Sequence, residues 1–152
     1  MRLDKMTSQL QTALADAQSM AVGRNQTGIE PEHLILALIE QQGSSVKPML
    51  AQAGFKIPVL QRSLQEKIDS FATLNSPSGD VQLSPNLAKL LNLADKQRQD
   101  FGDAYLSGEV VLLAALKDKS GVGKLLSQAG SAEEFANVVN KLRSGETIMD
   151  PE

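Results

Sequence analysis

The glycine-rich segment GVGKLL, residues 121–126, contains the kind of lysine that could hold a nucleotide phosphate. A phosphate-binding P-loop needs a glycine five residues before its Gly-Lys pair and a serine or threonine directly after the lysine, to bind magnesium. Asp118 and Leu125 stand at those two positions. The segment therefore predicts a helix start with a solvated lysine rather than a nucleotide site.

The single histidine, His33, is the one side chain whose ordinary pKa suits acid–base work near neutral pH. It lies in EPEHL, which lacks the second histidine of an HExxH motif, so a zinc site would be short of ligands. The absence of cysteine excludes disulfides, thiolate zinc sites and a Cys nucleophile. We therefore expect no metal, no cofactor and no catalytic residue in this chain, and interpret His33 as a polar residue at a helix start.

These residues belong to a segment that the chain contains twice. Residues 6–54 match residues 83–130 with an offset of 77, which becomes 76 after one deletion. A repeat of this length predicts two copies of a helical unit packed against each other. Where one copy is apolar and the other is polar at the same position, the fold does not require the apolar residue.

Three carboxylates are candidates for binding. Glu32 and Glu109 occupy matching positions in the first turns of two matching predicted helices, where the helix dipole and the free amides favour an acidic residue. That local effect is sufficient to explain both. Asp103 differs because its counterpart in the first copy is Gln26, so it is either a binding residue or a simple turn residue.

Two apolar residues of the second copy match polar residues of the first. Leu93 matches Asp16, and it lies roughly 60° beyond the edge of its helix's apolar stripe at 100° per residue. Val110 matches His33. The two residues predict a partly exposed apolar patch for a partner. Asymmetric packing of the two copies, or an isolated surface leucine, is the alternative interpretation.

The spacing of apolar residues predicts an all-α domain of eight helices in two pseudo-twofold four-helix repeats, with no strand. We expect the first repeat over about residues 6–72 and the second over about 83–145, joined by a connector at 74–80. The polar tail 146–152 is expected to begin a linker to a domain outside this sequence. Helices are expected to start after the caps Thr7, Ser84, Ser107 and Ser131 and at Pro31, Val46, Val59 and Val122.

Length and composition favour a single cytoplasmic domain. A chain of 152 residues can bury a core without disulfides or metal. The net charge is −3 and the lysines and arginines are scattered, so the basic stripe typical of nucleic-acid binding is missing. The opening MRLDKMT is not a signal peptide, and the longest apolar stretch, 110–116, is far too short to span a bilayer. We therefore expect neither nucleic acid nor membrane as a partner.

The opening MRLDKMT, the motif EPEHLILAL, its echo SGEVVLLAAL and the paired endings at Gly54 and Gly130 resemble the N-terminal repeat domain of Clp-type AAA+ unfoldases. The resemblance covers residues 1 to about 145. The opening and GDVQLSP are most similar to the ClpB disaggregase branch. The resemblance implies an eight-helix, pseudo-twofold domain. It would be tethered by a linker to an ATPase ring that is absent from these residues and that would bind ATP and magnesium in a homohexamer.

The resemblance also implies that the domain engages unfolded or aggregated polypeptides, aids their delivery to the hexamer pore, and serves a parent that cooperates with a DnaK-type chaperone system. Two departures from the family pattern stand out: Val110 replaces a longer leucine, which implies a shallower groove, and Glu30 replaces the usual Thr or Ser cap. The polar set and the adjoining apolar groove that the family uses correspond here to Thr7, Asp103 and Glu109, and to Leu91, Leu93 and Val110.

Two further functions compete with client engagement. An adaptor-docking module, as in the ClpA and ClpC branches, would bind a defined folded partner in a saturable, stoichiometric way. A free-standing all-α hydrolase would need a nucleophile with a base, or a set of metal ligands, and the sequence offers neither. Titration with an unfolded protein and with folded proteins distinguishes the first two functions.

Overall fold

The computed structural model describes residues 2–76 and 80–152; Met1 and residues 77–79, which belong to the predicted connector, lie outside the described residues. Within that part the chain forms one short 3-10 helix, η1 (Leu3–Lys5), and eight α-helices, with no named strand. The predicted all-α class and the predicted number of helices are confirmed for these residues. No helix among them is both long and apolar enough to cross a membrane.

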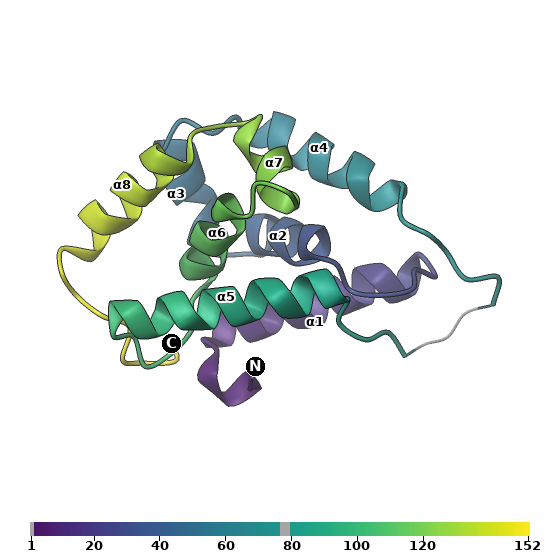
Figure 1. Cartoon of the computed structure of the whole chain (residues 1–152), viewed down its shortest axis with the longest axis horizontal. Helices are drawn as coiled ribbons and strands as arrows, with labels where there is room; N and C mark the ends of the chain where they lie inside the picture. Colours follow the sequence, from purple (N-terminus) through teal and green to yellow (C-terminus); the bar gives the residue numbers. More distant parts are fainter. Residues whose placement is uncertain (1, 77–79) are drawn as a thin grey trace.

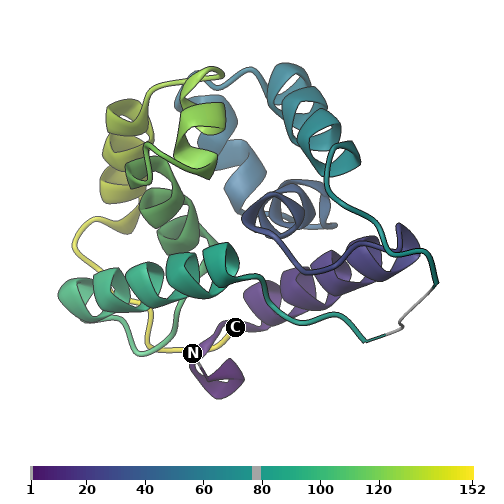
Figure 2. The same ribbon diagram turned by 45° about the vertical axis from the view of Figure 1, so that its right-hand side comes forward.

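The helices lie in three tiers. In Figures 1 and 2, α2 and α6 lie in the middle, between α1 and α5 on one side and α3, α4, α7 and α8 on the other. Helix α4 begins two residues earlier than expected, because Pro58 is tolerated within a first helical turn. The bounds are α1 (Ser8–Gly23), α2 (Pro31–Glu40), α3 (Val46–Gln52) and α4 (Ile57–Asp69) in the first repeat, and α5 (Pro85–Phe101), α6 (Gly108–Lys117), α7 (Val122–Ser127) and α8 (Ala132–Arg143) in the second.

The two central helices are buried on every face. In α2 all residues from Pro31 to Ile39 are buried, and in α6 all residues from Gly108 to Leu116 are buried. Only the charged last residue of each, Glu40 or Lys117, is exposed. A helix that is apolar nearly all round needs cover on all sides, and the surrounding helices of both repeats supply it.

Reciprocal backbone hydrogen bonds join the two repeats. The Thr7 amide donates to the Leu106 carbonyl at 2.9 Å, and the Leu106 amide donates to the Lys5 carbonyl at 2.7 Å. In each repeat, the segment before the first helix is thus hydrogen-bonded to the turn between the first and second helices of the other repeat. The matching pair, offset by 77 residues at every position, joins the Ser84 amide to the Ile29 carbonyl at 3.0 Å and the Ile29 amide to the Gln82 carbonyl at 2.9 Å.

Side-chain caps begin the first helix of each repeat. The Thr7 hydroxyl accepts a hydrogen bond from the Leu10 amide at 3.2 Å, and the Ser84 hydroxyl accepts one from the Leu87 amide at 3.0 Å. Both predicted caps are confirmed. Ser107 differs: it precedes α6 as predicted, but its hydroxyl is buried without a hydrogen-bond partner among the described residues, so it does not cap that helix.

Because the two caps are symmetry-related, removing either hydroxyl should cost the same. Thr7→Ala and Ser84→Ala are each expected to lower the free energy of unfolding by about 1 kcal/mol through the lost cap. Thr7→Ser and Ser84→Thr keep the hydroxyl and serve as matched controls, with stability within about 0.5 kcal/mol of the unchanged chain. Urea denaturation measures both. Equal stability of the alanine and hydroxyl variants would contradict the cap.

Candidate functional site

Leu93 is an exposed leucine on α5. Its side chain is 44% exposed, and its counterpart on α1, Asp16, is exposed as well. The prediction that Leu93 lies outside the buried stripe is therefore confirmed. A shallow hollow of about 180 Å³ adjoins it, lined by Leu93, Lys96, Gln97, Asp100, Ala114 and Lys117.

Val110 and Leu91 do not belong to the exposed surface, and the expectation that they line an open groove is wrong for this structure. Val110 is 0% exposed and Leu91 is 1% exposed. Val110 lies in the enclosed helix α6, and Leu91 lies on the core face of α5. The comparison of the copies misled at Val110 because its polar counterpart, His33, is also fully buried. A polar side chain can replace an apolar one in a core when its hydrogen bonds are satisfied there.

A chain of hydrogen bonds satisfies His33. The Glu30 amide donates to His33 Nδ1 at 2.9 Å, so the ring proton lies on Nε2, which is 2.6 Å from Gln26 Oε1. Gln26 Nε2 in turn donates to the Ile68 carbonyl at 2.6 Å. Burial, with a smaller contribution from Arg24, lowers the pKa of His33 to about 4. His33 is thus neutral near pH 7, and the interpretation of it as a polar residue at a helix start is confirmed.

The matching region of the second repeat holds an ion-pair cluster instead. The Arg143 guanidinium donates to both carboxylate oxygens of Asp103, at 2.9 and 2.8 Å, and to Glu109 Oε2 at 3.1 Å. The Asp103 side chain is 0% exposed and Arg143 is nearly buried. Burial alone would lower the pKa of Arg143, but hydrogen bonds and charge from Asp103 and Glu109 outweigh it and raise that pKa. Asp103 is therefore a buried residue paired with Arg143 rather than a simple turn residue.

The predicted polar set is close together but largely buried. Asp103 and Glu109 share Arg143. Thr7 is bound through its amide to Leu106, three residues after Asp103. The sequence reasoning missed Arg143, which lies 34 residues from Glu109 and 40 from Asp103. No local pattern links an arginine at the end of α8 to carboxylates at that separation.

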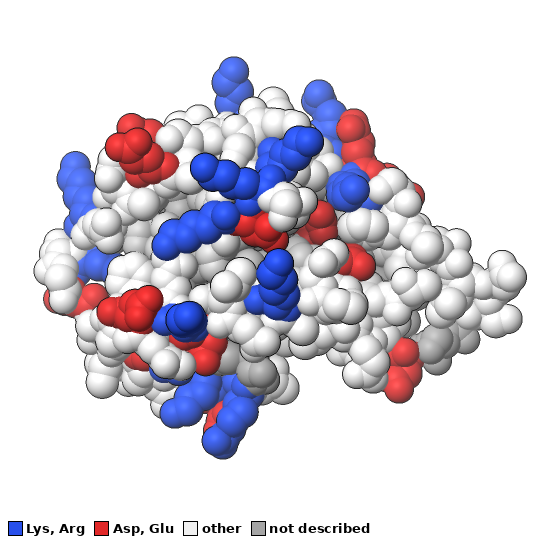
Figure 3. Space-filling model, viewed as in Figure 1, with Lys and Arg blue, Asp and Glu red and all other residues white. Residues whose placement is uncertain are grey.

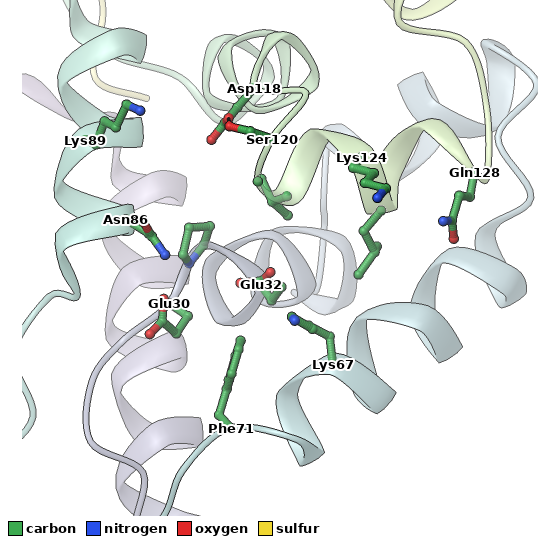
Figure 4. A pocket seen from close by; sticks show the side chains of 14 residues that line it. Glu30, Glu32, Lys67, Phe71, Asn86, Lys89, Asp118, Ser120, Lys124 and Gln128 are labelled. Atoms are coloured by element: carbon green, nitrogen blue, oxygen red, sulfur yellow. Dashed lines mark hydrogen bonds between the residues drawn. The ribbon is translucent and has the colours of Figure 1, made fainter.

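A second, larger cavity of about 520 Å³ lies between the repeats (Figure 4). Glu32 faces it from α2, and Lys67, Lys89 and Lys124 approach from α4, α5 and α7. Figure 3 shows lysine and carboxylate side chains gathered near the middle of this face. Lys124 is the lysine of GVGKLL, and it lies on the rim. Within the described residues no group of three His, Cys, Asp or Glu side chains could hold a metal ion.

Glu32 and Glu109 occupy matching positions in different surroundings. Glu109 is hydrogen-bonded to Arg143, whereas in the described residues no cationic side chain donates to Glu32. The pKa of Glu32 is raised, chiefly because burial disfavours the charged carboxylate. A hydrogen bond from the Glu32 backbone amide and the charge of Lys67 lower it, and the charge of Glu30 raises it further. The same residue type is therefore a carboxylate disfavoured by burial in the first repeat and one paired with an arginine in the second.

Neutralising these two glutamates should change stability in opposite directions. At pH 7, Glu32→Gln is expected to raise the free energy of unfolding, because a raised folded-state pKa means that the carboxylate is disfavoured above its unfolded pKa. Glu109→Gln, the matched control, should lower it by about 1–2 kcal/mol by weakening a charge-assisted hydrogen bond. Denaturant titrations at pH 7 test the pair. A loss of stability in both variants would contradict the difference in surroundings.

The titration of His33 provides an independent test. The chain has one histidine, so its ring proton signal in an NMR titration is unambiguous, and we expect a pKa near 4. Above about pH 8 His33 is neutral in both folded and unfolded chains and contributes no pH dependence. As pH falls from 6.5 to 4, the unfolded chain takes up a proton first, so His33 should lower the free energy of unfolding by roughly 3 kcal/mol. A measured pKa of 6 or above would contradict the buried neutral ring.

Comparisons with known proteins agree on one family. The model of the Clp repeat (R) N-terminal domain matches residues 5–129. The chain is 48% identical over 151 residues to the chaperone protein ClpB of Pseudomonas putida and 43% identical over 152 residues to that of Vibrio cholerae. Each alignment covers 99% of this chain but 18% of the relative, so the chain spans less than a fifth of the length of these proteins.

Solved structures show the same fold. The Hsp104 N-terminal domain from Candida albicans superposes with a TM-score of 0.86 at 21% identity and covers 97% of each chain. A ClpV N-domain in complex with a VipB peptide superposes with a TM-score of 0.72 at 22% identity and covers 93% of this chain and 89% of that one. With the family match over most of the sequence and a fold shared along nearly its whole length, the chain belongs to the Clp repeat N-terminal domain family.

Proposed function

We propose that this domain engages unfolded or aggregated polypeptides for a ClpB-type, ATP-dependent protein disaggregase and aids their delivery to the hexamer pore. The observation that carries the proposal is the half-exposed Leu93 beside its hollow, at a position where the other repeat has an exposed aspartate. The fold does not need a leucine there, so a binding role accounts for it. The similarity to ClpB chaperones supports the choice of partner.

The size of the hollow favours weak and unselective binding. At about 180 Å³ it lies below the roughly 300–1,000 Å³ of small-molecule pockets, so it suits a side chain of a client rather than a cofactor. Lys96, Asp100 and Lys117 place both signs of charge around it. Covering the exposed half of one leucine is worth about 1 kcal/mol, which allows a client to be released to the pore.

The other predicted binding residues enter this proposal as positioning residues. Asp103 and Glu109 are held by Arg143 and fix the turn before α6, while Thr7 fixes the start of α1. Leu91 and Val110 are buried core residues of α5 and α6, the helices that line the hollow. In the full-length parent we propose a homohexamer whose other domains bind ATP and magnesium and which works with a DnaK-type chaperone system.

A defined docking partner is the second candidate function. The solved complex of a ClpV N-domain with a VipB peptide shows that this fold can hold one particular peptide. An adaptor of the ClpA or ClpC kind would bind this domain with a fixed stoichiometry. Titration with casein, an unfolded protein, and with folded proteins distinguishes the functions: client engagement requires binding to casein and none to a folded control.

Replacing Leu93 should weaken client binding without unfolding the domain. Leu93→Gln is expected to lower the affinity for casein about fivefold, which corresponds to the loss of about 1 kcal/mol of apolar contact. Leu142→Gln removes a leucine on α8 that is 53% exposed and is the matched control, with unchanged affinity expected. Fluorescence anisotropy measures binding and thermal melting measures folding.

Two results would contradict this assignment. A loss of several kcal/mol in stability for Leu93→Gln would mean that Leu93 belongs to the core. Equal loss of casein binding in Leu93→Gln and Leu142→Gln would mean that the hollow has no special role. Asp16→Leu is the mirror variant: it should fold normally and create a second, weaker binding point on α1, because Asp16 is exposed where α5 has Leu93.

A further inference from the structure

The segment after α8 folds back onto the domain. Ser144 and Gly145 have φ angles of 48° and 83°, a left-handed pair that reverses the chain. In Figures 1 and 2 the segment then runs from α8 to the region where the N-terminal residues lie. Residues 146–152, which the sequence predicted to begin a linker, are here called the tail.

The tail is held almost entirely through its main chain. The Ile148 amide donates to Asp103 Oδ1 at 2.8 Å, and the Ile148 carbonyl accepts from the Ala104 amide at 2.6 Å. The Pro151 carbonyl accepts from the Ser8 amide at 2.8 Å. One side chain adds to this, since the Ser8 hydroxyl lies 3.3 Å from Glu152 Oε1. A segment of different sequence with an amide and carbonyls at the same spacing would satisfy the same partners.

The groups that hold the tail are also held by contacts that do not involve the tail. The Ser8 amide belongs to the first turn of α1, where a helix leaves its amides free. The Asp103 carboxylate is locked by Arg143, and Arg98 Nη1 donates to the Asp103 carbonyl at 2.8 Å. Groups that are already in place bind a flexible chain with less loss of entropy than mobile ones.

We call Ser8, Asp103 and Ala104 the main-chain edge, because they bind the main chain of the tail. The Ser8 and Ala104 amides donate to tail carbonyls, and the Asp103 carboxylate accepts from a tail amide. We propose that this edge is a docking site for an extended polypeptide main chain, that the tail occupies it in the free domain, and that an extended client segment binds there by displacing the tail. The inference rests on the proposed function and adds to it a mode of recognition that does not depend on client sequence.

The side chains of the tail support its role as a replaceable occupant. Ile148 and Pro151 are only half-buried, and Met149 is exposed. No apolar side chain of the tail is fully buried. The tail is tethered next to the main-chain edge, so it acts at a high effective concentration, commonly millimolar for a short linker. Because a client must compete with the tail for the edge, the apparent affinity for the client stays low.

Fixing the tail in place should reduce client binding. The chain has no cysteine, so a Ser8→Cys, Glu152→Cys double variant carries the only two thiols and can be joined by a short dithiol-reactive cross-linker. The joined form is expected to bind casein at least fivefold more weakly than the same variant left unjoined. The unjoined variant is the matched control, because the two forms share one sequence.

Releasing the tail should have the opposite effect. Ile148→Pro removes the amide that donates to Asp103, and Met149→Pro changes an exposed neighbour whose amide makes no hydrogen bond in the described residues. For Ile148→Pro we expect severalfold faster hydrogen exchange at the Ala104 and Ser8 amides and severalfold tighter binding of casein. Met149→Pro should change both quantities much less.

The possible outcomes separate the two proposals. Equal casein affinity in the joined and unjoined forms would overturn the inference while leaving the proposed function intact. Unchanged exchange at Ala104 and Ser8 in Ile148→Pro would also overturn it, because the tail would then not protect those amides. Absence of casein binding in every form, joined or free, would contradict the proposed function itself and the inference with it.

Discussion

Burial of two helices that are apolar on every face is the constraint on which the rest of this structure depends. Neither α2 nor α6 could be stable in water alone, and the helices of its own repeat leave part of its surface uncovered. Between the repeats, α2 packs against α5, and Gly108 at the start of α6 lies against the side chains of Leu38 and Val46. Contacts of α3 with α8 and of α4 with α7 join the outer helices of the two repeats. The reciprocal backbone bonds at Thr7 and Ser84 then fix how the repeats meet. The pseudo-twofold arrangement thus follows from the need to enclose both helices.

Because these helices are enclosed, every buried polar group in them needs a hydrogen-bond partner, and the two repeats supply such partners differently. The first uses a neutral set, in which His33 and Gln26 pass hydrogen bonds to a backbone carbonyl. The second uses a charged set around Arg143. A neutral set completes its bonds internally, whereas Asp103 retains capacity for one more donor, and the Ile148 amide uses it. The charged set therefore connects the core of the second repeat to the tail, residues 146–152.

The features with binding potential consequently gather on the second repeat. The second repeat contains Leu93 and its hollow. It also contains Asp103 and Ala104, two of the three residues of the main-chain edge. The hollow offers a single apolar contact and the edge offers a few main-chain hydrogen bonds. Each is weak, and together they could hold a chain of almost any sequence briefly. That combination is consistent with the proposed role, in which the domain binds a client weakly and releases it.

The sequence by itself determined the helices, the two repeats, the caps at Thr7 and Ser84 and the exposure of Leu93. These features depend on residues three or four positions apart, or on the comparison of the two repeats. They can therefore be inferred without knowing which residues far apart in the sequence are in contact. Only the tertiary structure decided that Val110 and Leu91 are buried, that Arg143 joins Asp103 to Glu109, and that the tail docks at Ser8 and Ala104. Each of these depends on which helix covers which face, and the partners lie tens of residues apart along the chain.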